Sequence, residues 1–167
     1  MSAGFGAVDV HYLADGTARA ALVVYDDATF ATHRADRIEV TTGVAAYEPG
    51  AFYKRELPAL RPVLDGTRLG LLIVDGFVDL DPDGRPGLGA HVHDVYGVPV
   101  IGVAKTAFAP ATHAIQVRRG NATRPLFVTS TDRDRAAAAA LVTAMAGPFR
   151  LPDALRRVDA LARRGTA

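Results

Sequence analysis

The sequence predicts an α/β domain with a mixed central sheet, in which an antiparallel three-strand meander is continued by parallel strands and flanked by helices. Residues 5–42 hold three strand-like segments in succession, which is typical of a meander. Beyond them, apolar segments alternate with helical ones, and this order implies parallel strands joined by right-handed crossovers. The 167 residues fit one domain, residues 1–167, whose core needs no disulfide or metal staple.

The meander is predicted from alternation and turn residues. In the first strand, residues 5–12, valines alternate with Asp9, so Asp9 lies on the face opposite the valines. Asp15-Gly16 is a hairpin signal, after which residues 17–25 return as a second strand. A third strand is expected at residues 37–42.

A helix is predicted over residues 51–64, after a turn at residues 46–50 that contains proline and glycine. Glu56 falls on the apolar stripe of this helix. Pro58 and Pro62 disfavour a long regular helix. The helix therefore either begins near Glu56, with Pro58 in its first turn, or is bent.

The next strand is the one around which the rest of the chain is arranged. Residues 69–74 are almost all apolar, as in a strand buried on both faces, and this strand delivers Asp75 and Gly76 to a fixed place at its end. A buried aspartate needs a cation, a hydrogen-bond donor or a metal beside it.

The remaining elements follow in chain order. We expect a short helix at residues 87–96, a buried strand at 99–104 closed by Lys105, a peripheral hairpin at 114–118 and 125–130, an alanine-rich helix at 134–145, and a last helix opened by Pro152.

Composition excludes several kinds of site. The chain has no cysteine, so any metal must be held by oxygen or histidine, and the available carboxylates favour magnesium or manganese. Residues 102–106 lack the first glycine of a phosphate-binding loop, which argues against triphosphate hydrolysis. Ser2 and Ser130, the only serines, lie in no nucleophile elbow, which argues against a serine hydrolase.

Charge and hydropathy bear on partners and location. A net charge of +1 gives no global basic field, so local clusters must decide the partner. Arginines gather late in the chain, at positions 118, 119 and 124 and at positions 156, 157, 163 and 164. No apolar run approaches the length of a membrane span and no leader begins the sequence, so we expect a cytoplasmic protein without membrane contact, and a monomer.

Four carboxylates share an unusual placement. Asp9, Glu56, Asp75 and Asp159 each lie on, beside or at the end of a face that should point inward. A single inward aspartate is more often a helix cap or a paired core residue. Two divalent ions, however, need several such oxygen ligands, and their charge makes burial of the carboxylates tolerable.

Other polar residues allow two interpretations. Lys105 is either a solvated strand end or a cation that faces phosphate, and His91 and His93 suit packing better than ligation. Tyr47 is ordinarily a lid over the core, although an aromatic at a loop tip can also wedge into a base stack. The late arginines are ordinarily a solvated face, but beside a metal site they would form a track for phosphates.

The order and spacing of several short motifs resemble the endonuclease V family, repair nucleases that recognise deaminated adenine and cleave the strand on its 3′ side. The resemblance covers nearly the whole chain. The matching segments are Val8-Asp9-Val10, Tyr47-x-Pro49-Gly50, Arg55-Glu56, Pro58-Ala59-Leu60, Val74-Asp75-Gly76, Gly87-Leu88 through His91, Ile101 to Lys105, Arg119-Gly120, Arg124 to Val128 and Arg150-Leu151-Pro152. The resemblance implies a ribonuclease H-like fold, which agrees with the elements above.

The resemblance also implies roles for individual residues. Asp9, Glu56 and Asp75 match the metal-binding acids, with Mg²⁺ as cofactor and Mn²⁺ as a possible substitute. Asp159 matches a last-helix position where members carry His or Asp, and Lys105 matches a lysine near the scissile phosphate. These five form the implied catalytic set. The implied substrate contacts are Tyr47 and Pro49 in a strand-separating wedge, Gly50 and Gly76 near the base pocket, and His91.

The chain departs from the family pattern at three places. Glu48 puts a negative charge into the wedge, Phe77 and Asp81-Pro82-Asp83 replace the usual histidine-containing segment after Asp75-Gly76, and the sequence begins just before its first catalytic strand. The leading hypothesis is a metal-dependent endonuclease acting 3′ to deoxyinosine or inosine in DNA or RNA. The alternatives are a non-cleaving nucleic-acid-binding relative and a nuclease for another structure, such as flaps or single strands.

Overall fold

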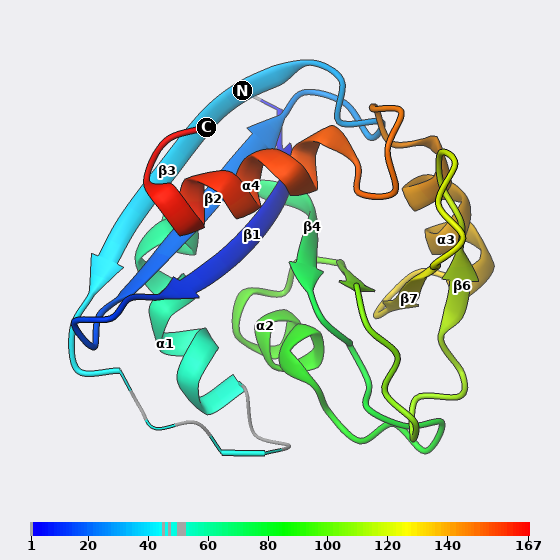
Figure 1. The fold of residues 1–167 in the computed structure, drawn as a ribbon, viewed down its shortest axis with the longest axis horizontal. Coiled ribbons are helices and arrows are strands. Elements are labelled where there is room, and N and C mark those ends of the chain that lie inside the picture. Colours follow the sequence, from blue (N-terminus) through cyan, green and yellow to red (C-terminus); the bar gives the residue numbers. More distant parts are fainter. Residues whose placement is uncertain (1, 45, 47, 50–52) are drawn as a thin grey trace.

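The computed structural model describes residues 2–44, 46, 48–49 and 53–167. Its strands form one seven-stranded sheet in the order β3-β2-β1-β4-β5-β7-β6, shown in Figure 1. The elements in chain order are β1 (Gly4–Tyr12), β2 (Ala18–Tyr25), β3 (His33–Thr41), α1 (Tyr53–Leu64), β4 (Leu69–Asp75), α2 (Leu88–Tyr96), β5 (Val100–Ala104), β6 (Ile115–Val117), β7 (Leu126–Ser130), α3 (Arg135–Ala144) and α4 (Asp153–Arg164).

The sheet is mixed, as the sequence predicts. Strands β1, β2 and β3 pair antiparallel as a meander. Strand β4 pairs parallel with β1 on one side and with β5 on the other. The hairpin β6–β7 then closes the sheet, with β7 antiparallel to β5. The parallel trio β1, β4 and β5 therefore stands in the middle, where all three strands end at the same edge.

Helices cover both faces of the sheet (Figure 1). Helices α3 and α4 pack on one core layer, to which Ala7, Ile73 and Val103 belong. Helices α1 and α2 pack on the other layer, which includes Val8 and Val74. Successive residues of β1 and β4 thus point into different layers, so these central strands are apolar on both faces.

Two predicted elements differ from the structure. Strand β3 begins at His33, four positions before the expected start at residue 37, because its first half is a half-exposed edge with no apolar alternation. Helix α1 begins at Tyr53 and contains both prolines, so the alternative start near Glu56 is wrong. The expected first two residues of this helix, 51 and 52, lie outside the described residues.

The end of α1 is braced from β3. The guanidinium of Arg37 donates to the carbonyl oxygens of Pro62 at 3.0 Å and of Asp65 at 3.1 Å. These acceptors lie in or just beyond the last turn of the helix, where carbonyls have no partner within the helix. The long edge strand therefore stabilises a helix that its prolines weaken.

A buried arginine ties the late loops together. The guanidinium of Arg119 donates to the carbonyls of Met145 (2.5 Å), Gly147 (2.9 Å) and Phe149 (2.7 Å), and the residue is only 6% exposed. The expectation that Arg119 could belong to a phosphate track is therefore wrong, because the side chain is buried and both of its Nη atoms donate inside the fold.

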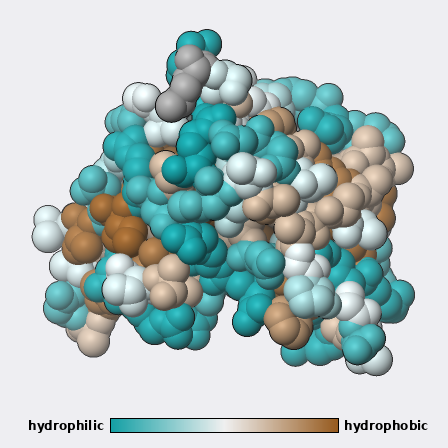
Figure 2. Space-filling model, turned by 90° about the horizontal axis from the view of Figure 1, so that it is seen from above, coloured by the Kyte–Doolittle hydropathy of each residue, from teal (hydrophilic) through white to brown (hydrophobic). Residues whose placement is uncertain are grey.

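The surface is mostly hydrophilic on the face seen from above in Figure 2, with apolar side chains in separate patches. Among the described residues, no helix combines the length and the apolar character that a membrane crossing requires.

We expect Arg119→Met to lower the free energy of unfolding by about 1–3 kcal/mol, because several buried carbonyls lose their donor at once. Arg118→Met is the matched control, since Arg118 is exposed and, within the part of the chain that the structure describes, donates only to the carbonyl of Thr123. Urea denaturation of both variants measures the difference. Equal stability of the two variants would contradict the role of Arg119.

Candidate active site

The parallel pairing of β1 with β4 sets two carboxylates side by side. The register pairs Val8 with Val74, so Asp9 and Asp75, the next residues along, are neighbours where the parallel pairing of the two strands ends. Asp75 is the last residue of β4, whereas Asp9 lies within β1, which continues to Tyr12. Asp9 and Asp75 come two residues after Ala7 and Ile73, so their side chains lie on the same face of the sheet, the one that α4 covers. The backbone amide of Val10 donates to Asp9 Oδ1 at 2.9 Å and holds that side chain in place.

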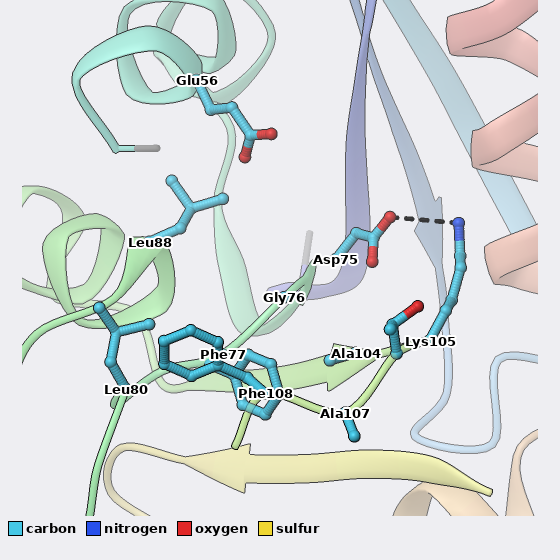
Figure 3. A pocket seen from close by; sticks show the side chains of 11 residues that line it. Glu56, Asp75, Gly76, Phe77, Leu80, Leu88, Ala104, Lys105, Ala107 and Phe108 are labelled. Carbon is cyan, nitrogen blue, oxygen red and sulfur yellow. Dashed lines mark ion pairs between the residues drawn. The ribbon is translucent and has the colours of Figure 1, made fainter. Parts of the chain in front are cut away.

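Lys105 reaches the same place from the next strand. The register pairs Asp75 with Val103, and Lys105 follows two positions later, on the same face of the sheet. Its Nζ lies 3.1 Å from Asp75 Oδ2 and 3.8 Å from Asp159 Oδ1. Figure 3 shows the Lys105–Asp75 ion pair beside the cavity.

The two helical acids approach from different sides. Glu56 lies in the first turn of α1, and Figure 3 shows its carboxylate directed toward the cavity that Asp75 also lines. Asp159 lies in the middle of α4, where Arg163 Nη2 donates to its Oδ1 at 3.2 Å. Asp159 is thus linked to the strand acids through Lys105.

The electrostatics of the site are those of crowded, poorly hydrated acids. Burial, and then the carboxylate of Asp75, raise the pKa of Asp9 to about 7. Burial, followed by Asp75 and Asp9, raises the pKa of Glu56 to about 8. Burial opposes the charge of Lys105, but Asp75, Asp9 and Asp159 outweigh it, so that the Lys105 pKa rises. The site therefore favours cations.

A divalent cation fits these residues by donor chemistry. Carboxylate oxygens are the ligands that Mg²⁺ and Mn²⁺ prefer. The burial of Asp9 and Glu56, and then their repulsion with Asp75, are the unfavourable energy that a bound cation would relieve. Among the described residues, no three acidic or histidine side chains are gathered closely enough to ligate one ion as they stand. The ammonium of Lys105 lies against Asp75 instead.

A cavity of about 440 Å³ opens next to the acids. Its polar wall is made by Glu56, Asp75 and Lys105, and its apolar wall includes Phe77 and Phe108, whose ring centroids are 6.0 Å apart. One end of the cavity is thus suited to a charged group of a ligand, and the other end, with its two aromatic rings, to a flat apolar group (Figure 3).

The loop after Asp75 is held by small residues. Gly76 has φ +127°, a conformation that side-chain-bearing residues rarely adopt. A Cβ on Gly102 would lie 2.6 Å from the Gly76 carbonyl oxygen, so β5 needs glycine there. The buried hydroxyl oxygen of Thr129 accepts from the Val78 amide at 2.9 Å. These contacts fix the direction in which the chain leaves Asp75.

The residues predicted to contact substrate do not gather at the cavity as the acids do. Gly76 lines the cavity. His91 lies on α2 and stacks on Tyr53, with ring centroids 3.7 Å apart, so its structural contact is a packing one. Pro49 is exposed, and Tyr47 and Gly50 lie outside the described residues. The contacts of these residues with substrate stay predictions.

Sequence reasoning missed a residue that positions Lys105. The guanidinium of Arg150 donates to the Lys105 carbonyl at 2.5 Å and to the Pro125 carbonyl at 2.9 Å. Arg150 was singled out only as part of a motif before the last helix. No spacing in the sequence signals this contact, because donor and acceptor are 45 residues apart.

Comparison with known proteins identifies the family. The family model described as Endonuclease V matches residues 3–160. Endonuclease V of Streptomyces avermitilis is 32% identical over an alignment that covers 87% of this chain and 72% of that protein. The chain belongs to the endonuclease V family. It is thereby placed among endonucleases, in a family that depends on divalent metal.

Solved structures agree with this placement. The crystal structure of the Streptomyces avermitilis endonuclease V aligns with a TM-score of 0.80 at 28% identity, covering 98% of this chain and 81% of that one. An endonuclease V from Ciona intestinalis, solved with DNA that contains an inosine, shares the fold with a TM-score of 0.77 at 16% identity, covering 97% and 84% of the two chains. The ribonuclease H-like fold expected from the sequence is confirmed.

The crowded acids predict an unusual dependence of stability on pH. In the folded chain Asp9 and Glu56 keep their protons up to about pH 7 and 8, whereas the unfolded chain releases them near 3.8 and 4.5. The folded state therefore binds more protons in this window, and the free energy of unfolding should fall as pH rises from about 4 to about 8. Thermal unfolding in EDTA across this range measures it.

The matched variants separate this effect from general acid sensitivity. The double variant Asp9→Asn/Glu56→Gln should flatten the fall, whereas Asp94→Asn, which removes an exposed acid of α2, should leave it unchanged. A fall of equal size in the double variant would show that other groups cause it.

Proposed function

We propose that the protein is a metal-dependent endonuclease that cleaves a DNA strand on the 3′ side of a deaminated base, leaving 5′-phosphate and 3′-hydroxyl ends, in DNA repair. The observation that carries the proposal is the register that sets Asp9 beside Asp75 and brings Lys105 against them, in a chain of the endonuclease V family. Mg²⁺ is the proposed cofactor, with Mn²⁺ as a substitute.

Asp9, Glu56 and Asp75 would hold the metal, and Asp159 is the candidate for an additional ligand from α4. The bound cations would supply an activated water and charge stabilisation at the leaving 3′ oxygen. Each ligand must be deprotonated to act, so the raised pKa values of Asp9 and Glu56 make metal compete with protons near neutral pH.

Lys105 would act on the phosphate. Its ammonium stays protonated at neutral pH because the surrounding carboxylates raise its pKa. A fixed positive charge at this edge of the sheet can offset the negative charge that develops on the phosphorane oxygens. Arg150 is a positioning residue in this scheme, because it holds the Lys105 backbone and not the phosphate.

The cavity supports a base taken out of the helix. Enzymes that act on altered bases turn the nucleotide out of the stack and read it in a pocket. Here the apolar wall with Phe77 and Phe108 adjoins the acids directly, so a base on that wall would leave its phosphate near Asp75. The Ciona relative solved with inosine-containing DNA supports the same substrate class.

The negative charge that Glu48 brings to the altered wedge is offset by a neighbouring lysine. Glu48, which would face an anionic strand, lies 3.3 Å from Lys54 Nζ, and both side chains are more than half exposed. This ion pair offsets the negative charge of Glu48 and favours retained contact with nucleic acid over loss of it.

The test is cleavage of an end-labelled duplex with one deoxyinosine, in Mg²⁺, Mn²⁺ or EDTA, beside an undamaged duplex and an inosine-containing RNA. A metal-dependent nick on the 3′ side of the lesion alone is the expected result. Binding without a nick under either metal would instead identify a non-cleaving relative. A nick confined to RNA, or to undamaged branched DNA, would identify a nuclease of different specificity.

We expect Asp75→Asn to lower the cleavage rate on the order of 100-fold or more, because the amide cannot replace the charge of the central carboxylate. Asp94→Asn, an exposed acid on α2, is the control and should cleave at the parent rate. Circular dichroism of both variants checks that they are folded. Unchanged metal-dependent cleavage by Asp75→Asn would overturn the assignment of the site.

A further inference from the structure

A second cavity lies along α4, outside the acidic site. It has a volume of about 440 Å³, and four of its eight lining residues are arginines: Arg156, Arg157, Arg163 and Arg164. Asp159 is the one acid in its lining. The chain as a whole has a net charge of only +1, so this concentration of positive charge is local to α4.

The four arginines are not equally available. Arg157 forms a two-point ion pair with Asp36 of β3, with contacts of 2.6 and 3.1 Å, and so serves the fold. Arg156 is exposed and lies over the ring of Phe149, which occupies its flat face and leaves its in-plane N–H groups free to donate. Among the described residues Arg164 makes no ion pair or side-chain hydrogen bond, and it is exposed.

The surface formed by Arg156, Arg163 and Arg164 is continuous with the acidic site. Arg163 contacts Asp159, and Asp159 lies 3.8 Å from the Lys105 ammonium, which in turn contacts Asp75. Arg156 and Arg164 stand on the two sides of Asp159 along the helix. An anionic chain lying on these arginines would therefore run past the point where cleavage is proposed.

The spacing matches a nucleic-acid backbone. Arg156 and Arg163 are seven residues apart, which is about 10 Å along a helix axis. One DNA strand carries a phosphate about every 3.4 Å of duplex axis, so this distance covers about three phosphates. Guanidinium groups are well shaped for bidentate contact with phosphate oxygens.

We propose that Arg156, Arg163 and Arg164 form a docking surface for the DNA backbone, which holds the strand beside the scissile phosphate along α4. The occupant is DNA because the surface is cationic, continuous with the acidic site and long enough to span about three phosphates. The inference rests on the proposed nuclease function and deepens it by placing the substrate strand.

The test measures how salt weakens binding of a fluorescein-labelled duplex with one deoxyinosine. Binding is measured in Mg²⁺ with Asp75→Asn as the parent form, so that cleavage does not consume the probe. Adding Arg156→Gln/Arg164→Gln should reduce the slope of log affinity against log salt by about 1.8, the loss expected for two phosphate contacts. Arg163 is left intact because it contacts Asp159.

The matched control is Arg61→Gln/Arg68→Gln. It removes the same charge from two exposed arginines, one on α1 on the opposite face of the sheet and one before β4, at the end of that strand away from Asp75. This control should keep the parent slope. A slope that falls equally in both double variants would show a general charge effect and overturn the inference, as would an unchanged slope in the α4 variant.

Two further readouts separate the inference from the function on which it rests. Thermal unfolding reports any loss of helix stability, which alone would not change the salt slope. Cleavage with the wild-type Asp75 restored reports catalysis. Binding that depends on α4 without cleavage would support the docking surface and overturn the nuclease assignment. Cleavage with an unchanged slope would do the reverse. A parent that binds no duplex would overturn the docking surface, and cleavage with Asp75 restored would still decide the nuclease assignment.

Discussion

The burial of one carboxylate beside another, where the parallel pairing of two strands ends, is the constraint on which this structure depends. Pairing β1 with β4 in register makes Asp9 and Asp75 neighbours, and nothing in the backbone can separate them without breaking that register. The surroundings are arranged to tolerate the pair: Lys105 contacts Asp75, and the Val10 amide donates to Asp9. Burial first, and then the carboxylate of Asp75, still raise the pKa of Asp9, so this compensation is incomplete, which is the condition under which a further cation binds favourably.

Much of the fold was predictable because its central strands carry strong local signals. Residues 69–74 and 99–104 are short, almost continuous apolar runs, which is the pattern typical of a strand covered on both sides. The first half of β3 was not predictable, since a half-exposed edge strand with His33 and Asp36 shows no alternation. The course of α1 through Pro58 and Pro62 was left open by the sequence, because the Arg37 brace comes from a distant strand.

The same distinction applies to the site. The acids could be found individually, because each interrupts an apolar pattern or ends an apolar strand. Their meeting depends on strand order and register, which local patterns in the sequence do not determine. The brace on Lys105 could not be found, because Arg150 binds a backbone carbonyl and any residue type offers one. Which of the late arginines serve the fold and which are exposed could not be predicted either. Arg119 is enclosed by loop carbonyls, whereas Arg164 is exposed.

The distribution of charge separates attraction of a nucleic acid from the chemistry performed on it. The acidic site by itself repels a phosphate, since Lys105 is one positive charge among Asp9, Glu56, Asp75 and Asp159. An anionic strand therefore needs positive charge elsewhere on its approach, and the exposed arginines of α4 are the charges that adjoin the site. Surface charges act over about 8–10 Å at physiological salt, whereas carboxylates around a cation act by contact. A protein with almost no net charge can in this way present a cationic approach to a centre that must itself be anionic to hold metal.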